Sequence, residues 1–252
     1  MADNKLDYIL QLADNALIYG HRLSEWTGHG PQLEVDMALS NISLDNIGAA
    51  RSFYQYAAEI EGGDKTEDSY PYLRDVRDFK NVLLVEIPNG DFAKTIARSF
   101  YFDCFQFHFY TALQQSSDER IAAIAAKSIK EVTYHWRYSK GWVIKLGDGT
   151  EVSKAKIQEA LNDVWDYAGE LFAPNKLELE MQAVGIAPDL APIKERWDNS
   201  VNEALKEATL TITDENGDWH HSGGKNGIHS EHLGFLLAEL QFVQRAYPNS
   251  EW

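Results

Sequence analysis

Cysteine is nearly absent from this chain, since Cys104 is the only one among 252 residues. An internal disulfide is therefore excluded, and we expect a protein of a reducing compartment, the cytoplasm. Long apolar runs are missing too: none approaches the ~20 residues that span a bilayer. The first ten residues lack the basic and apolar regions of a secretory signal, so we expect neither export nor a membrane role.

Positive charge is also scarce. Only 23 Lys and Arg residues oppose 39 Asp and Glu residues, which gives a formal net charge of -16. This excess repels polyphosphate at long range, so it disfavours an extended nucleic-acid interface or binding to an anionic membrane. Aromatic residues, in contrast, make up 12% of the chain. Much of their surface must be buried, either in a core or against a partner.

Apolar residues recur at steps of three and four along most of the chain, which predicts amphipathic helices. Four long helices are expected over residues 6–27, 31–60, 91–115 and 118–145. Further helices are expected over residues 73–85, 153–172, 192–209 and 230–247, and a hairpin or ordered loop over 211–228. Long helices joined by short turns pack as antiparallel neighbours. The sequence therefore predicts an all-α fold, with a four-helix bundle over about residues 5–146 and a helical extension over about 150–252.

Four acids lie at matching positions in the long helices. Asp14 and Asp45 are equidistant from the first turn, and Asp103 and Glu131 are equidistant from the turn near Ser117. Equidistant residues of an antiparallel hairpin lie at the same height, so all four acids could meet in one layer. Di-iron carboxylate bundles have this geometry, with two Glu residues and two Glu-x-x-His motifs. The alternative is four solvated or simply paired acids; buried acids without a metal would need Lys, Arg or Tyr neighbours, or shared protons.

The imidazoles of that motif are missing. Three residues after Asp45 and Glu131 the chain has Gly48 and Tyr134, and His135 points roughly 100° away from Tyr134 around its helix. We therefore predict a vestigial layer that holds no metal, and we expect no catalytic or cofactor-binding residue in this chain. The predicted layer consists of Asp14, Asp45, Gly48, Asp103, Glu131 and Tyr134. The alternative is that the chain is itself a di-iron oxidase, with an Asp-rich site completed by water.

Four histidines fall within one short C-terminal stretch: His220, His221, His229 and His232. Their spacing matches no zinc motif, so we interpret them as incidental residues of a surface loop. The glycines of residues 223–227 surround Lys225, but this is not a Walker motif. As a phosphate cradle it is a weak signal.

Segments spread over almost the entire chain share their order and spacing with one known family. They include Glu25-Trp26-Thr27-Gly28-His29, Asn41-Ile42-Ser43-Leu44-Asp45, Pro88-Asn89-Gly90 and Gly223-Gly224-Lys225-Asn226-Gly227-Ile228-His229-Ser230-Glu231-His232-Leu233-Gly234. These segments resemble the C subunits of bacterial ring-1,2-phenylacetyl-CoA epoxidase, the multicomponent oxygenase of phenylacetate degradation.

The resemblance implies a single ferritin-like domain over residues 1–252 and a structural, non-catalytic role. In that family the C subunit pairs with a homologous catalytic subunit, which holds the di-iron centre and oxidises the aromatic ring of the CoA thioester. Other subunits and the reductase are further expected partners, and a homodimer is left open. An unrelated helical scaffold without an oxygenase partner is the remaining alternative.

Overall fold

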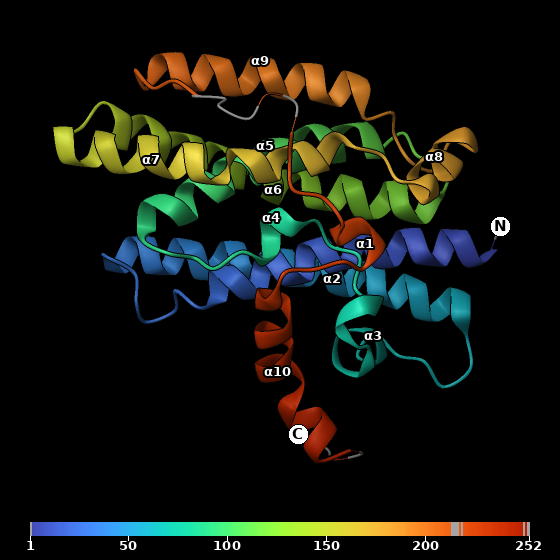
Figure 1. The fold of residues 1–252 in the computed structure, drawn as a ribbon. Helices are drawn as coiled ribbons and strands as arrows, with labels where there is room; N and C mark the ends of the chain where they lie inside the picture. Colours follow the sequence, from blue (N-terminus) through green and yellow to red (C-terminus); the bar gives the residue numbers. More distant parts are fainter. Residues whose placement is uncertain (1, 213–216, 218, 249, 251–252) are drawn as a thin grey trace. The chain divides into compact units, whose positions relative to one another are not determined.

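Helices are the regular secondary structure of the part of the chain that the structure describes. This computed structural model describes residues 2–212, 217, 219–248 and 250, and no β-strand occurs among them (Figure 1). The predicted all-α class is confirmed. Two compact units are distinguished, one formed by Met1–Pro88 with Gly223–Trp252 and the other by Asn89–Ser222. The single ferritin-like domain expected from the family resemblance stays a prediction.

The first unit is built on two long helices that pack against each other, α1 and α2. Its helices are α1 (Ala2–Ser24), α2 (Leu33–Glu61), α3 (Ser69–Leu73), η1 (Val76–Asp78), α4 (Leu83–Glu86), η3 (Gly224–Asn226) and α10 (Glu231–Ala246). The chain therefore returns to this unit at its C-terminal end. There α10 packs on α3 and η1 rather than along the α1–α2 pair.

The second unit is built around its helix α5, against which α6, α7 and α9 pack. Its helices are α5 (Phe92–Leu113), α6 (Glu119–Gly147), α7 (Glu151–Ala168), η2 (Gly169–Phe172), α8 (Lys176–Ala183) and α9 (Ala191–Glu207). Asp91, which immediately precedes α5, accepts a hydrogen bond from the Lys94 backbone N–H at 3.0 Å. Such caps satisfy the amides that a helix start leaves without partners, so they define where α5 begins.

One predicted helix is wrong. Residues 73–85 form the end of α3, the turn η1, an extended stretch and α4 instead of one helix. The backbone N–H of Lys80 donates to Asp14 Oδ2 at 2.8 Å, and that of Val82 donates to Asn15 Oδ1 at 2.8 Å. Because two side chains of α1 take these amides, the segment follows α1 as an extended strap.

A short helix was missed and a loop was only partly described. A capping box of Asn175 and Glu178, in which each side chain accepts a hydrogen bond from the other residue's backbone N–H, begins α8. This motif can be recognised in the sequence. Within the predicted loop of residues 211–228, residues 213–216 and 218 lie outside the described residues, and the rest contains η3. None of the helices with described residues has the length and apolarity that a bilayer crossing requires.

Candidate functional site

Asp14 on α1 is fully buried, and hydrogen-bond donors surround its carboxylate. Oδ1 accepts from the Tyr54 hydroxyl at 2.6 Å and from Arg74 Nη2. Oδ2 accepts from Arg74 Nη1 at 3.2 Å and from the Lys80 backbone N–H at 2.8 Å. Each carboxylate oxygen has about two acceptor positions, so these four donors use them all. The donor set at Asp14 therefore fits a guanidinium and does not fit a metal ion, which would have to displace it.

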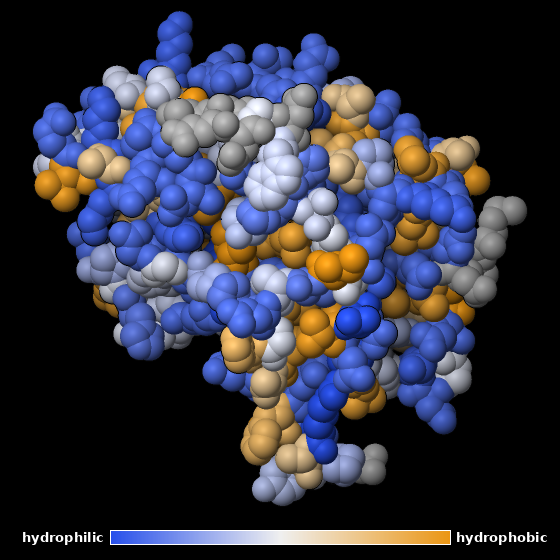
Figure 2. Space-filling view, in the orientation of Figure 1, coloured by the Kyte–Doolittle hydropathy of each residue, from blue (hydrophilic) through white to orange (hydrophobic). Residues whose placement is uncertain are grey.

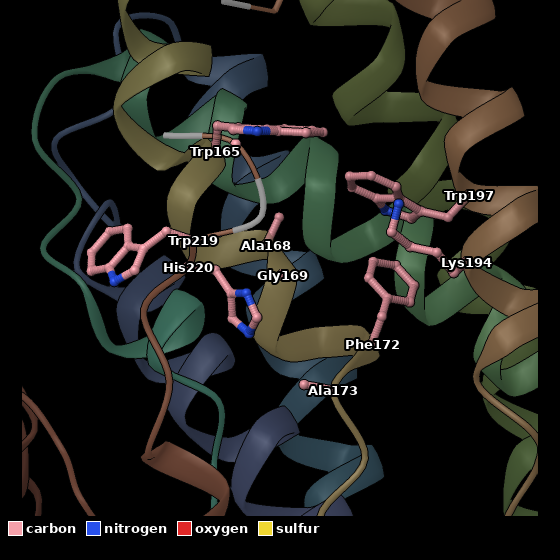
Figure 3. Close-up of a pocket in the computed structure, with 10 residues that line it drawn as sticks. Trp165, Ala168, Gly169, Phe172, Ala173, Lys194, Trp197, Trp219 and His220 are labelled. Carbon is pink, nitrogen blue, oxygen red and sulfur yellow. The ribbon is translucent and has the colours of Figure 1, made fainter. Parts of the chain in front are cut away.

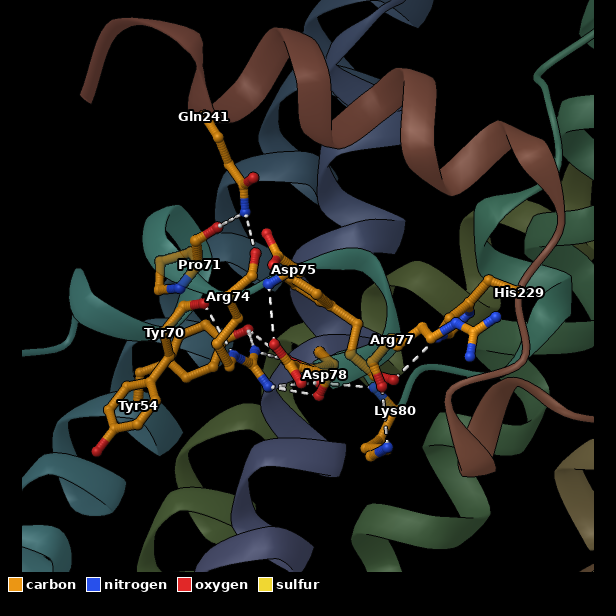
Figure 4. Close-up of polar contacts among 12 residues, drawn as sticks. Tyr54, Tyr70, Pro71, Arg74, Asp75, Arg77, Asp78, Lys80, His229 and Gln241 are labelled. Atoms are coloured by element: carbon orange, nitrogen blue, oxygen red, sulfur yellow. Dashed lines mark hydrogen bonds and ion pairs between the residues drawn. The ribbon is translucent and has the colours of Figure 1, made fainter. Parts of the chain in front are cut away.

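Arg74 is the centre of this network, as Figure 4 shows. Its Nε donates to the Tyr70 carbonyl at 2.9 Å, and its guanidinium carbon lies 4.3 Å from the centroid of the Phe79 ring. Burial lowers the pKa of Arg74, but the charge of the Asp14 carboxylate raises it by more. The pKa of Arg74 is therefore above its ordinary value. Burial, and then the charge of Asp14, raises the pKa of Tyr54 well above its ordinary value. Both side chains therefore remain protonated donors to Asp14.

The second acid of the first unit lies in a different environment. Asp45 and Gly48 on α2 are only partly buried, whereas their neighbours Asn46 and Ala49 are buried. A Cβ added at Gly48 would meet no atom within 4 Å. The buried face of α2 is therefore rotated away from the two predicted positions.

In the second unit, Asp103 on α5 is 1% exposed, whereas Glu131 on α6 is partly exposed. Tyr134 is 39% exposed, and the adjacent His135 is only 1% exposed. The inward face of α6 therefore includes His135, which the sequence argument had set aside, and not Tyr134. Burial, and then the charge of Glu131, raises the pKa of Tyr110 on α5.

The predicted acidic layer divides between the two units. Asp14 and Asp45 belong to the first unit, and Asp103 and Glu131 belong to the second. A common layer of all four acids stays a prediction. Over the described residues, no group of three or more His, Cys, Asp or Glu side chains is placed to hold a metal ion.

A second buried network was missed by the sequence analysis. Glu86 on α4 is fully buried; its Oε1 accepts the Ser230 backbone N–H at 2.7 Å, and its Oε2 lies 2.8 Å from His229 Nδ1. The His229 side chain is 1% exposed, and its Nε2 lies 2.8 Å from the Phe79 carbonyl, which can only accept. Burial lowers the pKa of His229, but the hydrogen bond and the charge of Glu86 raise it above its ordinary value. His229 is therefore a buried partner of Glu86, and its interpretation as an incidental loop residue is wrong.

The side chains of the other three C-terminal histidines take no part in the Glu86–His229 pair. His220 and His221 belong to the second unit, where the His221 ring stacks on Tyr167 with centroids 4.2 Å apart. His232, at the start of α10, offers its carbonyl to Arg22 Nη2 at 3.2 Å. Arg22 also donates twice to the Glu86 carbonyl, at 3.0 and 2.8 Å. The first helix is thus tied to the C-terminal segment.

The glycines of residues 223–227 serve close packing. A Cβ added at Gly224 would lie 2.2 Å from the Asn81 carbonyl oxygen. One added at Gly227, whose φ of 77° favours glycine, would lie 2.3 Å from the Arg77 carbonyl oxygen. Lys225 between them is buried, 6% exposed. This geometry presses the segment against residues 77–83 and accounts for the glycines without a phosphate.

The second unit has a cavity of about 340 Å³ lined chiefly by aromatic rings (Figure 3). Its lining includes Trp165, Phe172, Trp197 and Trp219. Among the described lining residues the ammonium belongs to Lys194, whose Nζ lies 5.5 Å from the Phe172 ring centroid. It also pairs with Asp198 at 2.6 Å, next to the cavity. The cavity therefore offers apolar surface and a cation whose charge is already balanced.

Comparison with known proteins gives a consistent result. The family described as "Phenylacetic acid catabolic protein" matches residues 1–252. The chain is also 46% identical over 245 residues to the C subunit of the 1,2-phenylacetyl-CoA epoxidase of Escherichia coli (strain K12). That alignment covers 97% of this chain and 98% of the relative.

Proposed function

Since this chain belongs to the phenylacetic acid catabolic protein family, we propose that it is the structural, non-catalytic C subunit of a phenylacetyl-CoA epoxidase in phenylacetate catabolism. The observation that carries the proposal is the 46% identity to an epoxidase C subunit over nearly the full length of both chains. The fold that goes with this function is a ferritin-like four-helix bundle with C-terminal helices. The partners are a di-iron catalytic subunit and, through the complex, its other subunits and reductase. The location that fits a single thiol, Cys104, is the cytoplasm.

The surroundings of Asp14 support a chain without iron of its own. An iron-binding carboxylate needs free lone pairs directed at the metal, and the Asp14 oxygens direct theirs at Tyr54, Arg74 and the Lys80 backbone N–H. Arg74 supplies the positive charge that a metal would otherwise supply. A buried acid of this kind holds helices in place, which is what a supporting subunit requires.

The test is purification with and without the catalytic subunit. Co-expressed with a catalytic epoxidase subunit, this chain should elute with it as one species in size exclusion, and conversion of phenylacetyl-CoA should require both chains. Metal analysis of the isolated chain should find far less than one iron per chain. Near-stoichiometric iron would instead support the di-iron oxidase alternative, and separate elution of the two chains would contradict the proposed pairing.

A further inference from the structure

The C-terminal helix α10 has two apolar faces, of which the first packs within its own unit. This face contacts α3 and η1. Its buried residues are Leu233, Leu236, Leu237 and Gln241. A surface helix of a self-contained domain needs only one such face, because the opposite side is expected to be polar.

The second face is exposed. Phe235 and Phe242, two helical turns apart, are each 65% exposed, and Val243 and Tyr247 are 39% and 60% exposed. Figure 2 shows apolar surface along the exposed side of this helix. Two phenylalanines at this spacing present their rings on one side, and each leaves roughly 100 Å² or more in solvent. Apolar patches built in this way mark interaction sites.

The second face continues into a cavity of about 240 Å³ at the end of α10. Tyr247 belongs to both, and the cavity is also lined by Tyr72 and Leu73, the latter 63% exposed. Interfaces gain most from a large side chain of one partner that fills a pocket of the other. The face and the cavity together provide a helical ridge followed by such a pocket.

Polar contacts to residues 71–75 hold α10 in position. Gln241 Nε2 donates to the carbonyls of Pro71 and Arg74 at 2.8 and 2.9 Å. Arg245 donates to the Arg74 carbonyl at 2.8 Å and pairs with Asp75 at 3.1 Å. The exposed face is thus presented by a helix that is already ordered, which lowers the entropy lost when a partner binds.

A charge on the face argues against a second copy of this chain. Glu239 is exposed and lies one turn from Phe235 and from Phe242, in the middle of the face. In a two-fold symmetric helix pair the middle of the face meets itself, so two Glu239 carboxylates would face each other. Two chains with a net charge of -16 each also repel. A different chain with a basic residue opposite Glu239 satisfies both conditions.

We propose that the exposed face of α10, formed by Phe235, Glu239, Phe242 and Val243 and extended by Tyr247 just after the helix, binds the catalytic subunit of the epoxidase together with the adjoining cavity. The complementary surface is an apolar groove with a Lys or Arg that faces Glu239 and a large apolar side chain that enters the cavity. This is recognition of a helix in a groove. It rests on the proposed function, because it locates on this chain the pairing proposed there.

The experiment compares two double variants for binding to the tagged catalytic subunit. Phe235→Ser with Phe242→Ser should weaken the dissociation constant by about 100-fold, since two central aromatic contacts are lost. Val152→Ser with Val184→Ser removes valines that are 68% and 46% exposed elsewhere, and should leave binding unchanged. Thermal melts of both variants should match the wild type, because all four side chains are exposed.

The charge is tested separately. Glu239→Lys should weaken binding, and more at low salt than at high salt, whereas Glu239→Gln should have a smaller effect. If the phenylalanine variant binds the catalytic subunit as tightly as the wild type, or if the valine variant loses as much affinity, the docking site is overturned and the proposed function stays intact. A wild-type dimer that the phenylalanine variant loses would assign the face to a second copy and also overturn it. Failure of the wild-type chain to bind the catalytic subunit would overturn the proposed function itself.

Discussion

In the unit formed by Met1–Pro88 and Gly223–Trp252, charged side chains are buried in complementary sets, Asp14 with Arg74 and Glu86 with His229. In the unit formed by Asn89–Ser222, aromatic rings pack against one another in the core, beside buried charged residues such as Arg98 and Asp103. Trp197, 1% exposed, lies with its ring centroid 5.1 Å from Phe172 and 5.6 Å from Tyr101. Aromatic packing is apolar and tolerates small shifts, whereas a buried ion pair is favourable only in one geometry. The Asp14 and Glu86 networks of the first unit therefore depend on precise register, whereas the ring cluster of the second unit depends on buried area.

The largest effect is expected in the aromatic unit. Trp197→Ala should lower the free energy of unfolding by roughly 4–5 kcal/mol, because it leaves a large cavity and removes the hydrogen bond from Nε1 to the Tyr101 carbonyl, 2.9 Å long. Urea denaturation measures the loss. Trp197→Phe should lose clearly less, and an equal loss would mean that the hydrogen bond and not the buried area dominates.

Removal of Arg74 should be nearly as damaging in the polar unit. Arg74→Met leaves the Asp14 carboxylate buried without its counter-charge and should cost roughly 3–4 kcal/mol. Asp14→Leu combined with Arg74→Met should recover much of this loss, since no charge then remains unbalanced. As a control, Arg51→Ala removes an exposed pair with Glu67 and should cost less than about 0.5 kcal/mol. A double variant less stable than Arg74→Met alone would refute this account.

The pair of Glu86 and His229 should make the polar unit sensitive to pH. The pKa of His229 is raised above its ordinary 6.5 in the folded protein, so the folded state binds the proton more tightly than the unfolded state. Its contribution is fully present below pH 6.5 and is lost as pH rises through the folded pKa.

Urea denaturation between about pH 5.5 and 9 tests this dependence. The stability difference between wild type and His229→Gln should shrink as pH rises, whereas the difference for Trp197→Ala should stay flat. A difference for His229→Gln that does not change with pH would show that the folded and unfolded states bind the His229 proton equally tightly, which contradicts a raised pKa.

The smallest change in stability is expected for Asp45, and it distinguishes Asp45 from Asp14, the other acid of the first unit. Asp45→Asn should change stability by less than about 1 kcal/mol, because Asp45 is partly exposed. Asp14→Asn should cost clearly more, since it removes the charge that balances Arg74. Thermal melts of both variants decide between these outcomes, and equal losses would contradict the contrast drawn from burial.

Local signals in the sequence predicted the long helices well. The turn before Asp91 and the cap itself are encoded within a few residues, and α5 begins where they predict. The box of Asn175 and Glu178 was equally local, so α8 could have been predicted. Residues 73–85 could not, because their helical spacing is overridden by hydrogen bonds to Asp14 and Asn15, more than 60 positions earlier in the chain.

By itself the sequence determined the all-α class, the family, and the absence of histidine three residues after Asp45 and Glu131, because periodicity, motifs and residue identity are properties of the chain. Only the tertiary structure decided which acids are buried and what balances them. Arg74 is 60 residues from Asp14, and Glu86 is 143 residues from His229. Which residues form such pairs depends on the rotation of each helix about its own axis and on the elements against which the C-terminal segment packs. A change of about 100° around a helix, one residue, exchanges a buried His135 for an exposed Tyr134.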